Sequence, residues 1–265
     1  MPNSTPKPNS RRLVRALLAA LSLAAACAGC GQASPRKLHG EGTVGLYTSL
    51  PIFWPEAGGV ADLLATDREA HWALAVLQER GEVVPLDTLA NREGVLDLPG
   101  DALLVLAQPR PLSPDENVAL DRWVRGGGRL LLFVDPLLTA HSDFALGDPR
   151  RPQDVALLSP ILAHWGLELL FDETALPGEH ETGWDGTGIP VNLAGHFRLI
   201  PGDARCALAA KAIVAECRLE KGRIVALADA AVLETGESRN VRSRAAALRK
   251  LLDHAQNGAA TPEKR

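Results

Sequence analysis

"DALLVLAQPRPLSPDENVALDRWVRGGGRLLLFV" (residues 101–134) begins and ends with a run of apolar residues, the pattern of strands buried on both faces. Between the runs, Ser113, Pro114 and Glu116 form the start signal of a helix, a capping box with proline at the first helical position. Three glycines at 126–128 end that helix. Because strand–helix–strand units almost always join parallel strands through a right-handed crossover, the stretch predicts two parallel core strands.

The same alternation extends on both sides of this unit. Strands are predicted at 43–50, 82–87 and 167–171, and helices at 68–81, 155–166 and 241–256. Residues 172–190, rich in glycine, proline and charge, predict a loop. From about residue 191, short apolar segments alternate with tight turns. The fold class predicted is α/β, a three-layer, flavodoxin-like sandwich with a mainly parallel sheet and β-rich hairpins near the C-terminus.

The N-terminus has the features of an export signal. Arg11, Arg12 and Arg15 form a basic region that leads into an apolar stretch at 13–26. This stretch is short for a membrane span but suits a signal peptide. Small residues before Cys27 resemble a bacterial lipobox, so Cys27 is predicted to carry a lipid; Cys30 is the alternative. A cleaved signal peptide without lipid is the other possibility. The predicted location is the periplasmic side of a bacterial membrane.

Length, net charge and local composition indicate the class of protein and its domain organisation. The chain has 265 residues and a net charge of −4, which argues against a nucleic-acid partner. It is divided into a signal peptide and lipobox at 1–30, a tether at 31–42, one α/β domain at 43–256 and a disordered tail at 257–265.

Two further cysteines lie in segments predicted to be neighbouring strands. A hairpin turning near residues 211–212 would place Cys206 opposite Cys217, and an exported protein permits a disulfide between them. Two buried free thiols are the alternative. With no histidine at ligand spacing, a metal site at these cysteines is not expected.

Three segments resemble a known family: "QPRPLSPDENVALDRWVRGGGRLLLFVDP", "LLSPILAHWGLELL" and "EKGRIVALADAAVLE". Together they look like the periplasmic domain of auxiliary proteins of gliding-motility-type ABC transporters and related uncharacterised domains. The resemblance covers about 43–235 and implies a fold similar to class I glutamine amidotransferases.

The amidotransferase chemistry itself is not expected. Such an enzyme needs a cysteine at the turn after a core strand, beside backbone N–H groups that bind an oxyanion. Here that turn, after residues 129–134, holds Asp135 and Pro136, and proline removes one N–H donor. The domain is therefore predicted to lack this enzyme's activity.

Candidate binding residues follow the strands at their carboxyl ends, where α/β folds place ligand sites. Asp135 is also explained as a turn residue that accepts local N–H bonds, and the two arginines of "GDPRRPQD" as partners of Asp148 and Asp154. The full set of ligand- or partner-binding candidates is Thr48, Ser49, Trp54, Glu56, Arg110, Asp135, Arg150 and Arg151.

The leading functional prediction is a non-enzymatic envelope lipoprotein, an accessory or binding module beside an ABC-type transport system. Its expected partners are a membrane, through the N-terminal lipid, and ABC transporter subunits or another envelope protein; no cofactor or metal is expected. The alternative is a hydrolase that uses carboxylates such as Glu56, Asp135 and Asp148 at the sheet edge. Clustered carboxyl groups with one raised pKa would favour the hydrolase. A purely structural lipoprotein would lack a concave site there.

Overall fold

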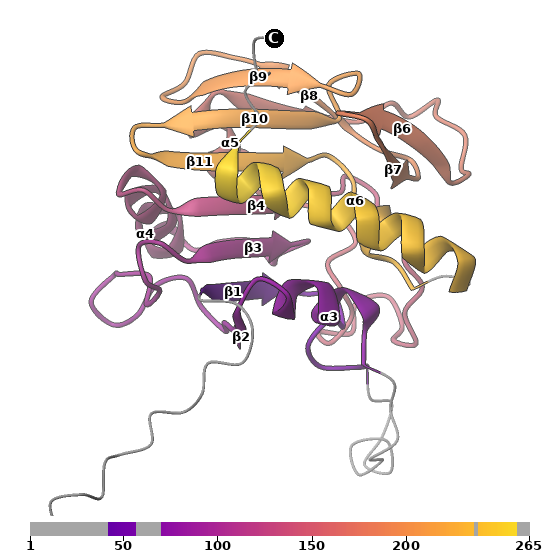
Figure 1. Ribbon diagram of the computed structural model, residues 1–265, viewed down its shortest axis with the longest axis horizontal. Helices are drawn as coiled ribbons and strands as arrows, with labels where there is room; N and C mark the ends of the chain where they lie inside the picture. Colours follow the sequence, from indigo (N-terminus) through magenta and orange to yellow (C-terminus); the bar gives the residue numbers. More distant parts are fainter. Residues whose placement is uncertain (1–41, 57–69, 236–237, 259–265) are drawn as a thin grey trace, which may run out of the picture. The chain divides into compact units, whose positions relative to one another are not determined.

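The computed structural model describes residues 42–56, 70–235 and 238–258. The predicted signal peptide, the lipid site at Cys27 or Cys30, almost all of the tether and residues 259–265 of the predicted tail lie outside these residues. The described part centres on a seven-stranded sheet with the order β2-β1-β3-β4-β11-β10-β9 (Figure 1). Its strands are β1 (Thr43–Thr48), β2 (Glu82–Pro85), β3 (Leu103–Ala107), β4 (Arg129–Phe133), β9 (Arg205–Ala209), β10 (Val214–Leu219) and β11 (Gly222–Leu227).

The first five strands of that order are parallel, and the last two run antiparallel to their neighbours. A mixed α/β fold with a mostly parallel sheet and antiparallel hairpins near the C-terminus is thus confirmed.

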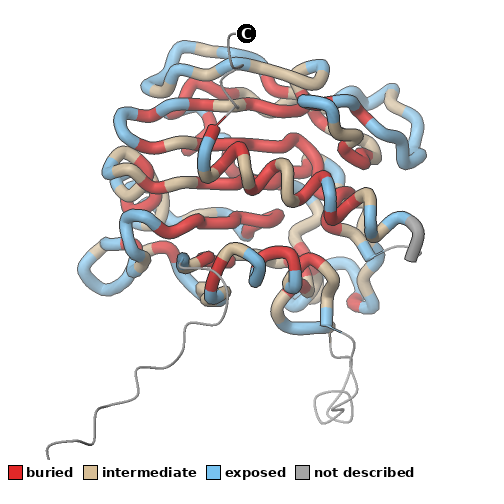
Figure 2. Tube along the Cα trace, viewed as in Figure 1, coloured by how far each residue is buried: buried red, intermediate tan, exposed pale blue. Residues whose placement is uncertain are grey.

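Helices cover both faces of the sheet. Helices α3 (Trp72–Gln78) and α6 (Ser238–Asn257) share one core with the sheet, and α4 (Pro114–Arg125) and α5 (Ser159–Trp165) share the other. Alternate residues of β3 enter the two cores, with Val105 on one side and Leu104 and Leu106 on the other. Figure 2 shows most of the length of the central strands as buried. Burial on both faces explains why β3 is apolar at every position and β4 at every position after Arg129.

The crossover between β3 and β4 forms as its sequence predicts. The Ser113 hydroxyl accepts the Glu116 N–H, and the Glu116 carboxylate accepts the Ser113 N–H at 2.9 Å. The same carboxylate also accepts the N–H of Leu89, which holds the preceding loop against the start of α4. This capping box therefore fixes both the start of the helix and the loop before β3.

The predicted loop at 172–190 is wrong, because the structure forms a hairpin there. Strand β6 (His180–Trp184) pairs with β7 (Thr187–Val191) across a two-residue turn. Asp185 and Gly186 both have positive φ angles, as the favoured type of tight hairpin turn requires. Strand β5 (Leu167–Leu170) is also separate from the main sheet and pairs with β8 (His196–Leu199).

Strand β11 occupies a central position beside β4, although it also forms a hairpin with β10. The hairpin turns at Glu220 and Lys221, and its next residue, Gly222, packs against the end of α4. A Cβ atom at Gly222 would lie 1.8 Å from the carbonyl oxygen of Val124, so no other residue fits. The close approach of this turn lets β11 enter the parallel sheet next to β4.

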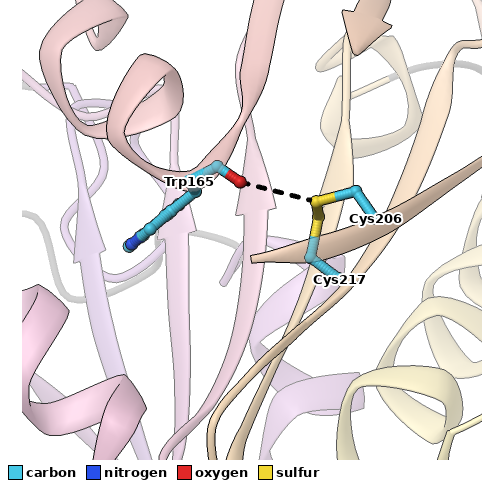
Figure 3. The surroundings of a disulfide bond; sticks show 3 residues. All are labelled: Trp165, Cys206 and Cys217. Carbon is cyan, nitrogen blue, oxygen red and sulfur yellow. Dashed lines mark hydrogen bonds between the residues drawn. A yellow bond between two sulfur atoms is a disulfide. The ribbon is translucent and has the colours of Figure 1, made fainter. Parts of the chain in front are cut away.

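A disulfide joins the last two strands of the sheet. Cys206 of β9 lies directly opposite Cys217 of β10, and their sulfur atoms are bonded (Figure 3). The Cys206 sulfur also contacts the carbonyl oxygen of Trp165 at 3.8 Å. The bond therefore fastens the edge strand β9 to the sheet, next to the end of α5.

Replacing both cysteines, Cys206→Ala with Cys217→Ala, is expected to lower the free energy of unfolding by about 3 kcal/mol. The bond closes a chain segment with a sequence separation of 11, and opening it returns that conformational entropy to the unfolded chain. Urea unfolding with and without reductant measures the effect, and the double variant, which no reductant should affect, is the control. Equal unfolding midpoints for oxidised and reduced wild-type protein would contradict it.

Candidate functional site at the carboxyl edge of the sheet

Two aspartates follow neighbouring parallel strands at equivalent positions. Phe133, the last residue of β4, is in register with Leu227 of β11. Asp135 and Asp229 each come two residues later, and both are fully buried. The register therefore places two carboxyl groups side by side at the carboxyl edge of the sheet.

Both aspartates accept backbone N–H groups of the loops that follow. Asp135 accepts from Leu137 at 2.8 Å and, with its other oxygen, from Ala230 at 3.1 Å. Asp229 accepts from Asn192 at 2.9 Å and from Ala231 at 2.5 Å. Asp135 therefore acts as the turn residue that the sequence offers as one explanation, and its buried oxygens are not available to a ligand.

Burial shifts the ionisation of both groups. It raises the pKa of Asp135 to about 6, although two N–H donors favour its charged form, and the charge of Glu234 adds to the rise. Burial, followed by the charge of Asp135, raises the pKa of Asp229 well above its ordinary value. A buried carboxyl pair at one edge thus retains protons at a pH where isolated aspartates are ionised.

This shift predicts a loss of stability as pH rises from about 4 to about 6. The folded-state pKa of Asp135 lies above its unfolded value, so the protonated form stabilises the fold below pH 4 and this stability is lost as pH rises through 6. A difference of about 2 pKa units corresponds to about 3 kcal/mol. Urea unfolding between pH 4 and 7 should show a flatter profile for Asp135→Asn than for wild type.

The readout is the slope with pH, because the amide of Asp135→Asn can accept only one of the two N–H groups and shifts the whole curve downward. Asp97→Asn, at an exposed position, is the matched control and should leave the slope unchanged. If the free energy of unfolding changes with pH equally in wild type and in Asp135→Asn, the titration of Asp135 does not cause the predicted loss of stability.

A cavity of about 370 Å³ lies at this edge beside the end of β1. We call it the tryptophan cavity, and six of the eight residues that the sequence singles out line it: Thr48, Ser49, Trp54, Glu56, Arg110 and Arg150. Asp135 and Arg151 are outside its lining. The structure therefore brings together residues from the ends of two strands and from two loops.

Two of these residues serve the framework. The Thr48 hydroxyl donates to the carbonyl oxygen of Ala107, the last residue of β3, at 2.8 Å. The Ser49 hydroxyl donates to the carbonyl oxygen of Gln108 and accepts the N–H of Gln153. Their hydroxyls hold the strand ends and the loop at 137–158 together, so the walls of the cavity are fixed before any ligand binds.

Three other lining residues, Trp54, Arg110 and Arg150, are exposed to solvent. The Trp54 side chain is 71% exposed and meets the Phe53 ring edge-on, with ring centres 4.9 Å apart. Arg110 donates to the carbonyl oxygen of Pro149 at 2.7 Å. Arg150 pairs with Asp148 at 2.8 Å and lies 4.3 Å from the centre of the Phe144 ring. This arrangement offers an aromatic face and two guanidinium groups at the mouth of one cavity.

Arg151 has a different place from its neighbour. Its guanidinium donates to Asp154 at 3.0 Å and to the carbonyl oxygen of Phe144 at 2.8 Å. Asp148 is held by Arg150, whose hydrogen bonds lower the pKa of that carboxyl to about 2. Arg150 and Arg151 thus pair with Asp148 and Asp154 and shape the loop. These pairs are the alternative explanation that the sequence gives for the arginines of "GDPRRPQD".

Two further cavities, of about 80 and 700 Å³, adjoin the tryptophan cavity, and Pro51 borders all three. We call the three together the groove. Glu234 lines the smallest cavity, Glu56 lines the other two, and His71 and His141 stand between the smallest and the largest. Burial lowers the pKa of His71 to about 4, so its imidazole is neutral at pH 7.

Two glutamates of the groove are held by one loop. The Ser142 hydroxyl donates to Glu56 at 2.7 Å, and the N–H of Asp143 donates to its other oxygen at 2.8 Å. The Thr139 hydroxyl donates to Glu234 at 2.6 Å. Thr139 and Ser142 are three residues apart, so their Cα atoms are separated by at most about 11 Å. One loop therefore holds a carboxylate of the smallest cavity, Glu234, and a carboxylate of the other two cavities, Glu56.

Glu234, its partner Thr139 and Asp229 are not among the candidate residues predicted from the sequence. One signal for Asp229 is present: "LADA" repeats the placement of an aspartate two residues after a buried strand, as in "FVDP". No comparable local signal identifies Glu234, because its position depends on where β11 enters the sheet.

Within the described ranges, no group of three or more histidine, cysteine, aspartate or glutamate side chains is arranged to hold a metal ion. Over the same ranges, no helix has the length and apolar character needed to cross a membrane.

Comparison with known proteins gives structural likenesses only. No protein-family model matches the chain, and no curated protein matches it. An exo-β-1,4-mannosidase from Opitutaceae bacterium strain TAV5 is 16% identical, with a TM-score of 0.43, over 82% of this chain and 34% of its own. A GH42 β-galactosidase from G. stearothermophilus is 14% identical, with a TM-score of 0.44, over 82% of this chain and 30% of its own.

A structure described as the mmIFT52 N-terminal domain is 12% identical, with a TM-score of 0.49, over 83% of this chain and 99% of its own. The chain thus spans about a third of the length of the glycosidases that it matches.

These comparisons correct the leading functional prediction. A non-enzymatic envelope accessory or binding module beside a transporter was expected, whereas solved structures similar to this chain include several glycoside hydrolases. That prediction is wrong.

Proposed function

We propose that the protein is a hydrolase whose two working carboxyl groups are Glu56 and Glu234 in the groove. The observation that carries the proposal is their placement: Ser142 and Thr139, three residues apart in one loop, donate hydroxyl hydrogen bonds to the two glutamates. Both carboxylates line the groove and are half-buried, so a substrate can reach them.

The chemistry that suits such a pair is cleavage of a glycosidic bond. In enzymes that cleave such bonds, two carboxyl groups about 5 to 10 Å apart flank the bond, and one protonates the departing oxygen. The other carboxylate either deprotonates a water molecule or attacks the sugar carbon itself. In both cases the departing oxygen gains a hydrogen atom and the sugar carbon gains a hydroxyl group, which together make up one water molecule. Hydrogen bonds from Ser142 and from the N–H of Asp143 keep Glu56 in one orientation for this step.

The buried aspartates behind the groove support the site without touching the substrate. Asp135 binds the N–H of Ala230, and Asp229 binds that of Ala231, at the start of the segment that leads to Glu234. The Nε1 atom of Trp72 donates to the carbonyl oxygen of Glu234 at 3.1 Å. Glu234 is thereby fixed through its backbone as well as its side chain.

Two further expectations from the sequence remain proposals of ours. The scaffold is amidotransferase-like and related to the periplasmic domains named above, and the chain is anchored by lipid at Cys27 or Cys30 on the periplasmic side of a membrane. The disulfide between Cys206 and Cys217 supports the location, because such bonds persist in oxidising compartments. Labelling with radioactive palmitate in wild type and in Cys27→Ser and Cys30→Ser variants tests the anchor.

The test of the hydrolase is direct assay of the full chain, purified in detergent, on nitrophenyl glycosides and nitrophenyl esters. The matched blank is the double variant Glu56→Gln with Glu234→Gln, purified in the same way. Release of nitrophenolate by wild type above this blank supports the proposal. Equal rates for the two proteins on every compound would refute it.

A further inference from the structure

We infer that the tryptophan cavity is a subsite for an acidic sugar residue of a saccharide substrate. The inference rests on the proposed hydrolase and concerns the part of the groove next to Glu56, which lines both this cavity and the largest one. A substrate cut at Glu56 must extend along the groove to either side. The lining of the tryptophan cavity then determines which sugar unit is accepted on that side.

The aromatic group in this cavity fits a sugar ring. The Trp54 side chain is 71% exposed, and its ring meets the Phe53 ring edge-on. An exposed indole at the mouth of a polar cavity offers a flat apolar face, which the C–H face of a sugar ring covers while its hydroxyls stay hydrated. A volume of about 370 Å³ is enough for one or two sugar units.

The cavity is less suited to an extended peptide. Peptides are commonly bound by adding a strand to a free sheet edge. The strand that leads into this cavity, β1, is already paired on both sides, with β2 and with β3. The edge strand β2 also reaches the cavity, but with its last residue, Pro85, which has no N–H to donate to an added strand.

Arg110 supplies the preference for an acid. Its guanidinium is exposed, and its hydrogen bond goes to the carbonyl oxygen of Pro149. Among the residues that the structure describes, no carboxylate forms an ion pair with Arg110, although Asp87 and Glu56 line the same cavity. Arg150, in contrast, is already paired with Asp148. Arg110 thus has N–H donors left for a ligand carboxylate, which guanidinium groups bind in a two-pronged manner.

Binding of trigalacturonic acid and of neutral galactotriose, measured by calorimetry, tests the inference. Both are titrated into the full chain carrying Glu234→Gln, so that binding is measured without hydrolysis. We expect the acid to bind at least about 10-fold more tightly than the neutral trimer, and Arg110→Gln to abolish this difference. Trp54→Ala should weaken both ligands by about 10-fold, and Trp54→Phe should restore most of that loss.

Arg122→Gln is the matched control, because Arg122 is exposed on α4, donates to the carbonyl oxygen of Gly94 and lies outside the groove. It should leave both affinities unchanged. Equal affinity for the two trimers, or no effect of Arg110→Gln, overturns the inference. Tighter, Trp54-dependent binding of the acidic tripeptide Asp-Asp-Phe also overturns it in favour of a peptide ligand.

Failure of the inference and failure of the hydrolase are distinguishable. Hydrolysis of neutral nitrophenyl glycosides with no preference for the acidic trimer overturns only the acidic subsite. Selective, Arg110-dependent binding of trigalacturonic acid that wild type never cleaves, with no nitrophenyl substrate cleaved either, supports the subsite and overturns the hydrolase.

Discussion

Glu234→Gln is expected to lower kcat/KM of the hydrolase by at least about 100-fold, with the loss in kcat rather than in KM. Glutamine keeps the size of the side chain and can still accept the Thr139 hydroxyl, but it can neither donate an acidic proton nor carry a negative charge. Proton transfer by a positioned side chain contributes about 100- to 10,000-fold to rate. Glu56→Gln should cause a loss of similar size for the same reason.

Steady-state kinetics on the best nitrophenyl substrate measures both variants. If the two glutamates act in one step, the double variant loses far less than the product of the single losses. Glu93→Gln, at an exposed position outside the groove, serves as the control and should retain full activity. Unchanged kcat in either single variant would remove that glutamate from the proposed role.

The local parts of the fold are predictable because their signals are local. The capping box at Ser113, the proline after it and the glycines at 126–128 all lie within the crossover that they define. Apolar runs at consecutive positions identify β3 and β4 as strands buried on both faces. Only neighbouring residues are needed for these inferences, so the sequence alone supports them.

The hairpin β6–β7 is missed because two signals compete. The glycines and prolines of 172–190 favour a loop, while Asp185-Gly186 between Trp184 and Thr187 is a strong hairpin signal. The outcome depends on packing: Trp184, Ile189 and Val191 are buried in the core beside α6. Helix α6 lies far from this segment in the sequence, so the local pattern of residues cannot reveal the contact.

The candidate site is only partly predictable for a similar reason. Residues that directly follow β1, β3 or β4 are placed at the carboxyl edge by the strand order, so Trp54, Glu56 and Arg110 are found. Asp229 and Glu234 reach the same edge because β11 inserts beside β4, and the resulting bond from Ala230 to Asp135 joins residues 95 positions apart. The burial that raises the pKa of Asp135, and the charge of Glu234 that adds to the rise, therefore depend on the topology of the sheet.

Trp165→Ala is expected to lower the free energy of unfolding by about 4 kcal/mol, the largest loss we predict for a single substitution in the core. Trp165 ends α5, is fully buried in the core that α4 and α5 share with the sheet, and donates from Nε1 to Asp121 at 2.9 Å. Removal of the indole leaves a large cavity and deprives the Asp121 carboxylate of one partner, although Arg125 remains bound to it.

Thermal unfolding followed by circular dichroism measures this loss as a decrease in Tm of roughly 10 °C. Trp54→Ala is a matched control with the same change of side chain at a site that is 71% exposed, and it should alter stability by less than about 0.5 kcal/mol. If Trp165→Ala does not fold, Trp165→Phe retains most of the volume and isolates the loss of the Asp121 hydrogen bond, at about 1 to 2 kcal/mol. A loss below about 1 kcal/mol for Trp165→Ala would mean that the core between α5 and the sheet collapses into the space. The close contact of the Trp165 backbone with Gly202 and Cys206 argues against such a movement.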